Sequence, residues 1–170
     1  MSYVDLHVHS NASDGTLSPE QVVRLAHEAG LSAIALTDHD TTAGVAGAAE
    51  AGAELGLEVV PGIEVSSSFR DHEIHILGLF VDTDSPSLQA ALKEFRHHRD
   101  QRNQEMLGRF DAHGIHLTAE DLCAGNPDTV ITRAHVARAL LAKGLGPDLD
   151  HIFKKYLQYG GIYCPPKEFL

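Results

Sequence analysis

The spacing of hydrophobic residues in the first part of the chain changes repeatedly between the period of a strand and that of a helix. Residues 3–8 alternate polar and apolar side chains, whereas Ser18-Pro19-Glu20 supplies an N-cap and a first-turn proline that open a helix. The predicted elements are strand 3–8, helix 18–30, strand 32–37, helix 42–55 and strand 57–60. Because strands alternate with helices, we expect a parallel sheet.

The pattern then changes from strands to helices. Residues 63–69 and 73–81 resemble two further strands joined by a turn. After the polar stretch 82–86 the remaining pattern is helical, at about 86–112, 119–124, 133–143 and 148–159. These features predict two parts, residues 1–82 and residues 83–170. Pro165-Pro166 is typical of a connector, so we expect the chain to stop within a longer structure.

Length and composition indicate an ordinary globular protein. The 170 residues are 43% hydrophobic, enough for one domain with a core or for one domain and an appendage. No apolar run approaches the ~20 residues that a membrane helix needs, and no signal peptide is recognisable, so we expect a cytoplasmic protein with no membrane partner. Cys123 and Cys164 have no partner motif, which argues against a disulfide framework or a cysteine zinc site.

The negative charge is concentrated in the first part of the chain. Residues 1–82 contain 13 acidic and two basic residues, whereas residues 83–170 contain 11 of each, so the first part accounts for the net charge of −11. Divalent cations bound there would offset this charge locally. The acidic composition therefore does not exclude an anionic substrate.

Candidate chemistry begins in the first predicted strand, Asp5-Leu6-His7-Val8-His9. The period of two places Asp5, His7 and His9 on one face. Two imidazoles at positions i and i+2 can converge on one ion, and neutral imidazole binds zinc, iron or manganese. The alternative for an isolated His-x-His is a buried histidine that only satisfies a hydrogen bond.

Further polar clusters follow the other apolar runs. They are Asp38-His39-Asp40, Glu64 and Glu73-Ile74-His75, with Asp14 in a turn after the first strand. We expect these groups to gather at the carboxyl ends of neighbouring parallel strands, where α/β folds place their sites. Burying so many ionisable groups together would be costly without a cation. The sequence therefore predicts a metal cluster.

These motifs resemble a known family. Asp5–Ser10, Leu36–Thr41 and Pro61–Ser66 are similar to the first three motifs of the PHP (polymerase and histidinol phosphatase) family. Three further stretches resemble the branch that contains nucleoside 3′,5′-bisphosphate phosphatases and RNase AM, a 5′→3′ exoribonuclease: Ser13–Thr16, His75–Leu79 and Thr132–Arg138. The resemblance covers essentially the whole chain.

The resemblance implies a distorted (β/α)7 barrel with up to three divalent metals, manganese first and iron or zinc as alternatives. It implies that His7, His9 and Glu64 bind the first metal and are the catalytic residues. Glu64 would bridge to a second metal held by His75, and Asp14 with His39 would bind a third. Asp5, Asp38 and Asp40 would orient the imidazoles. The later ligands of the family are absent from these 170 residues.

By the same resemblance, residues 83–170 correspond to a helical insertion that forms a lid. Arg96, Arg99 and Arg102 recur on one side of the long predicted helix, and Arg133 with His135 opens a later one. A solvated charged face is one interpretation of these residues. Substrate phosphate binding is the other, and we assign it to Arg99, Arg133 and His135.

The predicted activity is hydrolysis of a phosphate ester by a metal-bound hydroxide. The expected substrate is a nucleotide 3′-phosphate or a short 5′-phosphorylated RNA, with histidinol phosphate as an alternative. Amidohydrolases also begin with His-x-His, but they predict a carboxylated lysine, and residues 1–82 contain no lysine. A non-catalytic or truncated PHP module is a third alternative. An incomplete barrel would also leave an open apolar edge at 3–8 or 73–81, through which the chain could self-associate.

Overall fold

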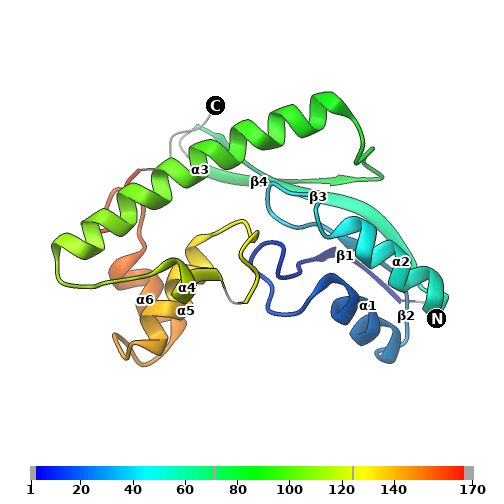
Figure 1. Ribbon diagram of the computed structural model, residues 1–170, viewed down its shortest axis with the longest axis horizontal. Coiled ribbons are helices and arrows are strands. Elements are labelled where there is room, and N and C mark those ends of the chain that lie inside the picture. Colours follow the sequence, from blue (N-terminus) through cyan, green and yellow to red (C-terminus); the bar gives the residue numbers. More distant parts are fainter. Residues whose placement is uncertain (1–2, 71, 124, 167–170) are drawn as a thin grey trace. The chain divides into compact units, whose positions relative to one another are not determined.

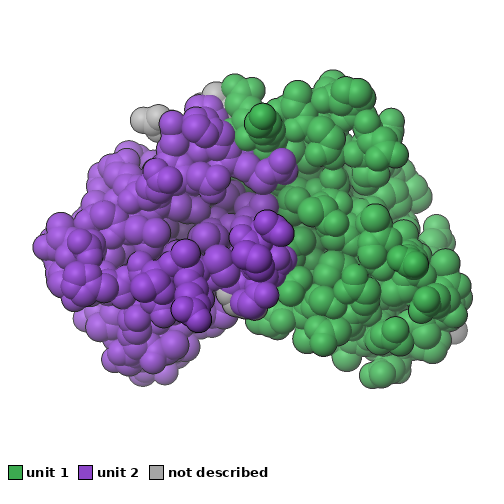
Figure 2. Space-filling view, in the orientation of Figure 1, with its two compact units in different colours: residues 1–94 green, residues 95–170 purple. Residues whose placement is uncertain are grey.

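The computed structural model describes residues 3–70, 72–123 and 125–166. In chain order its elements are β1 (Tyr3–Val8), α1 (Pro19–Glu28), β2 (Leu31–Leu36), α2 (Val45–Leu55), β3 (Glu58–Phe69), β4 (His72–Leu79), α3 (Pro86–Ala112), α4 (Ala119–Cys123), α5 (Arg133–Ala142) and α6 (Leu149–Tyr156) (Figure 1). The chain divides into two compact units, residues 1–94 (unit 1) and residues 95–170 (unit 2) (Figure 2). This division falls inside α3, whereas the sequence predicts a boundary at residues 82/83.

Unit 1 is a mixed α/β structure built on a curled sheet of four strands in the order β1-β2-β3-β4 (Figure 1). β1 pairs with β2 and β2 with β3 in parallel, as the alternation of strands and helices predicts. β4 is antiparallel to β3. The sheet is therefore parallel on one side and antiparallel on the other.

β3 differs from the sequence prediction, because the two strands predicted at 57–60 and 63–69 are one strand, Glu58–Phe69. Pro61 lies within this strand although it has no N–H to donate. Its carbonyl accepts a hydrogen bond from the N–H of Val81 at 3.1 Å. A Cβ on Gly62 would lie 2.8 Å from the Leu36 carbonyl oxygen, so only glycine lets the strand pass β2 so closely. The first part of β3 pairs with β2 and its later part pairs with β4.

Helices α1 and α2 pack on the sheet and bury the core of unit 1. The Ser18 hydroxyl accepts a hydrogen bond from the N–H of Gln21, whose side chain accepts one from the N–H of Ser18. α2 ends at Gly56 in the left-handed conformation, with φ of 72°. The buried residues of this core are Val22, Val23, Ala26, Ile34, Leu36, Ala48, Ala51 and Leu57.

The two outer strands of the sheet carry exposed apolar side chains. Val4 is 54% exposed on β1, and Ile76 is 55% exposed on β4. Exposed Tyr3 and Leu6 extend the first patch, and Ile74 extends the second. The predicted apolar surface at 3–8 or 73–81 is thus confirmed at both edges.

Unit 2 is helical, with a core of its own. α3, α4, α5 and α6 contribute buried side chains that include Phe110, Leu122, Leu140 and Ile152. The segment after α6 also packs here, because Cys164 is buried and the Tyr163 ring stacks on Phe110 with centroids 4.7 Å apart. The sequence predicts a connector at this point, but its aromatic side chains complete the core.

None of the described helices is long and apolar enough to cross a membrane, and the predicted cytoplasmic location stays a prediction.

Candidate metal centre

Six predicted ligands converge in unit 1 in three overlapping groups. Within each group, ligand atoms lie within 4.8 Å of one another. The groups are His7, His9 and Glu64; His9, Asp14 and His39; and His39, Glu64 and His75. Since each group shares members with another, the six side chains form one cluster.

The first ligands come from β1 and the loop that follows it. Strand alternation brings His7 and His9 to the same side, with ring centroids 5.1 Å apart. The loop then turns back tightly, because the N–H of Gly15 donates to the Ser10 carbonyl at 2.9 Å. A Cβ on Gly15 would lie 2.6 Å from the His9 carbonyl oxygen, so the turn requires glycine. It places an Asp14 oxygen 2.7 Å from His9 Nδ1.

His39 is held against β3 by the loop after β2. The N–H of Asp40 donates to the Glu64 carbonyl at 3.0 Å, and the N–H of Glu64 donates to the Asp38 carbonyl at 3.2 Å. Asp40 has a φ of 52°, a left-handed conformation that aspartate tolerates better than most residues. His39 thereby forms a parallel bridge with Glu64, beyond the end of β2 at Leu36.

His75 reaches the cluster by a different route from the predicted one. It lies on β4, which is antiparallel, and so is not at the carboxyl end of a parallel strand. In the register, Glu64 is opposite Leu77 and Ser66 is opposite His75, which places Glu64 and His75 on one face as diagonal neighbours. His75 Nδ1 lies 2.8 Å from a Glu64 oxygen.

Glu64 is at the centre of the cluster. Only 3% of the residue is exposed. One carboxylate oxygen, Oε2, lies 3.2 Å from His7 Nε2, 2.9 Å from His9 Nε2 and 3.4 Å from His39 Nδ1. Burial by itself would raise the pKa of Glu64, but the imidazoles around it, His39 first, lower the pKa below its ordinary value.

Asp14 and His9, which lie beside Glu64, shift each other's pKa. Burial opposes the charge on Asp14, but its hydrogen bonds with His39 and His9 hold the pKa of Asp14 far below the ordinary value. Burial also opposes the charge on His9, but the nearby Asp14 and Glu64 raise the pKa of His9. The cluster therefore keeps its carboxylates ionised at neutral pH.

The donor set fits divalent metal ions. His9 Nε2 and His39 Nδ1 are buried and make no hydrogen bond with the described residues, although Glu64 Oε2 lies nearby. Ligand atoms ~2.1 Å from one ion lie at most about 4.2 Å apart, so the observed separations need only small side-chain movements. Imidazole nitrogen with carboxylate oxygen suits manganese, iron or zinc.

The three carboxylates predicted to orient imidazoles have other partners in the structure. Asp38 accepts hydrogen bonds from the N–H of Ser10 at 2.8 Å and from the hydroxyls of Ser10 and Ser13 at 2.7 and 2.6 Å. These bonds fix the loop between His9 and Asp14. Asp5 accepts from the N–H of His7, and Asp40 from the N–H of Ser66. Their predicted effect on the imidazoles stays a prediction.

Some contacts within the site were not predicted. Ser10 and Ser13 anchor Asp38, and a Glu73 oxygen lies 3.0 Å from His75 Nε2. The spacing of Glu73 and His75 on one strand face could have indicated their pairing. The serine contacts could not have been found, because they depend on a turn geometry that the sequence pattern does not fix.

The predicted substrate-binding residues lie in unit 2. Arg99 and His135 are buried, unlike side chains of a solvated charged face. His135 Nδ1 accepts a hydrogen bond from the N–H of Thr132 at 3.0 Å and so caps α5. Arg133 donates to the Leu157 carbonyl at 3.2 Å. Whether these three residues contact substrate stays a prediction.

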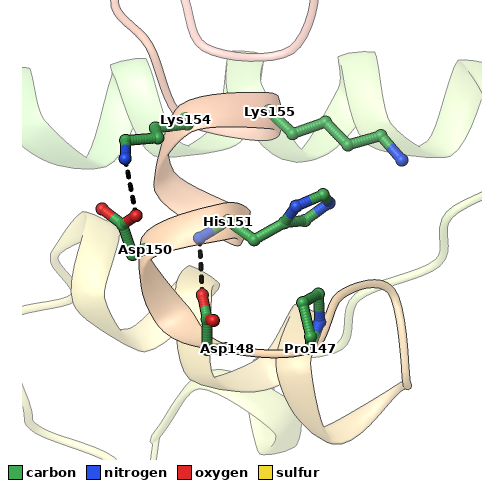
Figure 3. Close-up of a pocket in the computed structure, with 6 residues that line it drawn as sticks. All are labelled: Pro147, Asp148, Asp150, His151, Lys154 and Lys155. Atoms are coloured by element: carbon green, nitrogen blue, oxygen red, sulfur yellow. Dashed lines mark hydrogen bonds and ion pairs between the residues drawn. The ribbon is translucent and has the colours of Figure 1, made fainter.

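A surface depression of about 470 Å³ lies elsewhere in unit 2, on α6 (Figure 3). Its charged side chains are satisfied locally, since Lys154 donates to Asp150 at 2.6 Å and Asp148 accepts from the N–H of His151 at 2.8 Å. The depression contains no predicted site residue. The histidine and carboxylate cluster is therefore the stronger candidate for chemistry.

Comparison with known proteins identifies the family of the chain. The PHP domain model matches residues 5–162. The chain therefore belongs to the PHP domain family.

Three similar proteins illustrate the relationship. The 3′,5′-nucleoside bisphosphate phosphatase of Chromobacterium violaceum is 40% identical over 162 residues, which are 94% of this chain and 56% of that protein. The 5′-3′ exoribonuclease Rnm of Escherichia coli is 40% identical over 169 residues, 96% of this chain and 57% of that protein. A C. violaceum structure described as an amidohydrolase with bound sulfate and no metal is 38% identical, with a TM-score of 0.90 over 98% of this chain and 59% of that one. The chain thus spans a little over half the length of these relatives.

Proposed function

We propose that this chain provides the metal-binding residues of a phosphoesterase that hydrolyses phosphate esters of nucleotides. The observation that supports this most directly is the convergence of four imidazoles and Asp14 around the buried carboxylate of Glu64. Such a constellation is suited to several divalent ions close together, which is typical of phosphoryl-transfer sites.

The proposal assigns the ligands by group. His7, His9 and Glu64 hold one metal and are the catalytic residues, Glu64 with His75 and His39 holds a second, and Asp14 with His9 and His39 holds a third. The family resemblance assigned His39 to the third metal alone and His9 to the first alone. The added roles follow from the position of His39 between Glu64 and Asp14 and from the contacts of His9 with both carboxylates. Manganese is the preferred ion, with iron and zinc as alternatives. When bound, such ions lower the pKa of water and neutralise phosphate oxygens.

The chain's own groups prepare this site before any ion binds. The lowered pKa values of Glu64 and Asp14 keep both carboxylates ionised, so no proton has to be removed from them when a cation enters. Asp38 holds the loop that separates His9 from Asp14. The backbone bonds of Asp40 and Glu64 hold His39 in place. The ligands are thereby held close to the positions that they need.

The proposed substrate is a nucleotide 3′-phosphate or a short 5′-phosphorylated RNA. Two relatives at 40% identity are named for such reactions, and the similar C. violaceum structure contains sulfate, which resembles phosphate in shape and charge. Arg99, Arg133 and His135 are proposed to bind substrate phosphate, since guanidinium groups match phosphate oxygens geometrically.

The alternative of a non-catalytic PHP module is disfavoured because all six expected ligands are present and close together. An amidohydrolase with a carboxylated lysine is disfavoured because residues 1–82 contain no lysine. Histidinol phosphatase activity is the remaining enzymatic alternative.

Metal analysis combined with a substrate panel tests the proposal. Purified protein is analysed for bound metal and assayed with manganese on adenosine 3′,5′-bisphosphate, short 5′-phosphorylated RNA and histidinol phosphate. We expect bound divalent metal and turnover of a nucleotide substrate, both lost in Glu64→Gln. Protein without metal affinity would refute the metal proposal, and turnover of histidinol phosphate alone would refute the substrate assignment.

We also propose that the apolar outer strands allow the chain to self-associate. Within the described part of the chain, β1 and β4 are the two edge strands of the sheet, and both expose apolar side chains. A second copy of the chain would cover these surfaces.

A further inference from the structure

Two guanidinium groups lie against the ring of Tyr159 in unit 2, and a third lies close to one of them. The guanidinium carbon of Arg133 lies 3.8 Å from the ring centroid, and that of Arg102 lies 5.7 Å from it. Arg99 is the third member. Burial lowers the pKa of Arg102, and the charges of Arg99 and Arg133 lower it further. Arg102 is therefore close enough to both Arg99 and Arg133 to be repelled by their charges.

The surroundings of Arg102 do not offset this repulsion well. Tyr159 and Cys164 favour its charge, but burial and the two neighbouring guanidinium groups outweigh them, so the pKa of Arg102 stays below its ordinary value. Arg102 Nε is buried and has no hydrogen-bond partner in the described part of the chain. A buried donor without an acceptor and adjacent like charges are both unfavourable. An anion with several oxygen acceptors would relieve both.

The ring of Tyr159 is held by a short segment that is anchored on both sides. Leu157 is fully buried, and its carbonyl accepts a hydrogen bond from Arg133. Tyr163, on the other side, stacks on Phe110 in the core of unit 2. Because the segment is fixed by packing, the ring can restrict two long side chains that would otherwise be mobile.

We propose that Tyr159 is the positioning residue of a phosphate-binding site formed by Arg99, Arg102 and Arg133. Its ring holds Arg102 and Arg133 ready to bind one phosphate group of the substrate. The identity of the ligand rests on the proposed function, whereas the site rests on the contacts within unit 2. Arg102 and Tyr159 thereby join Arg99 and Arg133 as determinants of substrate affinity.

The test measures binding of adenosine 3′,5′-bisphosphate to the full chain by calorimetry at pH 8 with a chelator, so that metals take no part. Tyr159→Leu keeps an apolar side chain but removes the ring, and we expect about tenfold weaker binding. Tyr159→Phe keeps the ring face and should bind within about twofold of wild type. Lys154→Gln is the matched control, because it removes one positive charge from unit 2 at an ion pair with Asp150, and its affinity should not change.

The outcomes separate this inference from the proposed function. The inference is overturned if Tyr159→Leu folds and binds the nucleotide with wild-type affinity. It is also overturned if Tyr159→Phe loses as much affinity as Tyr159→Leu. If Tyr159→Leu does not fold, Arg102→Gln decides, and unchanged affinity in that variant overturns the site. Absence of nucleotide binding to the chelated wild type also overturns it and leaves metal content and turnover untouched. Glu64→Gln that loses metal but keeps nucleotide affinity under chelation supports two separate sites.

Discussion

Replacing Glu64 with glutamine tests the proposed central ligand of the candidate metal centre. The substitution keeps the size of the side chain and removes the charge that lies within 3.4 Å of His7, His9 and His39 nitrogens. Loss of a group that only supports a metal ligand costs 10–100-fold in affinity. Because Glu64 belongs directly to two of the ligand groups, we expect its loss to weaken metal binding at least hundredfold. This is about 2.7 kcal/mol of binding free energy.

This loss converts into a measurable change in thermal stability. With manganese at about 100 times the wild-type Kd, binding stabilises the folded protein by about 2.7 kcal/mol. A hundredfold weaker site at the same concentration gives only about 0.4 kcal/mol. At roughly 2–4 °C per kcal/mol for a chain of this size, the metal-induced rise in Tm should shrink by roughly 5–9 °C.

The assay is circular dichroism melting with and without manganese, paired with metal analysis by mass spectrometry. Glu58→Gln is the control, because Glu58 is exposed at the start of the same strand, and its metal-induced rise should equal that of wild type. If Glu64→Gln shows the full wild-type rise in Tm and the same metal content, Glu64 is not a ligand and the assignment of the cluster fails.

Four further predictions concern the support of the site and the outer strands. Asp38→Ala leaves the N–H of Ser10 and two hydroxyls without their buried acceptor, and should lower the free energy of unfolding by about 3–5 kcal/mol in urea titrations. Gly62→Ala changes no proposed ligand, but its Cβ would clash with the Leu36 carbonyl and shift β3, which carries Glu64. It should therefore weaken manganese binding at least tenfold, as measured by calorimetry. Folding lowers the pKa of Asp14 and of Glu64, so both carboxylates stabilise the folded protein at any pH above their pKa values in the unfolded chain. This stabilisation is lost as the pH falls below those unfolded-state pKa values. The Tm of metal-free protein should therefore decrease from about pH 5 to pH 3. Ile76→Lys should reduce self-association in sedimentation velocity, and an unchanged distribution would exclude β4 as the contact.

The sequence by itself determined most of the local structure. Capping residues, periodicity and glycine stops predicted the helices to within a few residues, because these signals act between neighbours in the chain. The Ser18 cap and the Gly56 terminus are examples. The six candidate ligands could also be picked out, since five of them lie in or just after predicted strands, Asp14 lies in the turn after the first strand, and all six fall in stretches that resemble motifs of the PHP family.

Only the tertiary structure decided how these ligands meet. The register of β3 against antiparallel β4 brings His75 to Glu64, and no local pattern specifies which residues of two strands are paired. Continuity of β3 through Pro61 depends on the close approach of β2 at Gly62. The guanidinium cluster around Tyr159 likewise joins residues from α3, α5 and the segment after α6. Such contacts arise from packing between distant segments, whereas sequence patterns report mainly what neighbours along the chain favour.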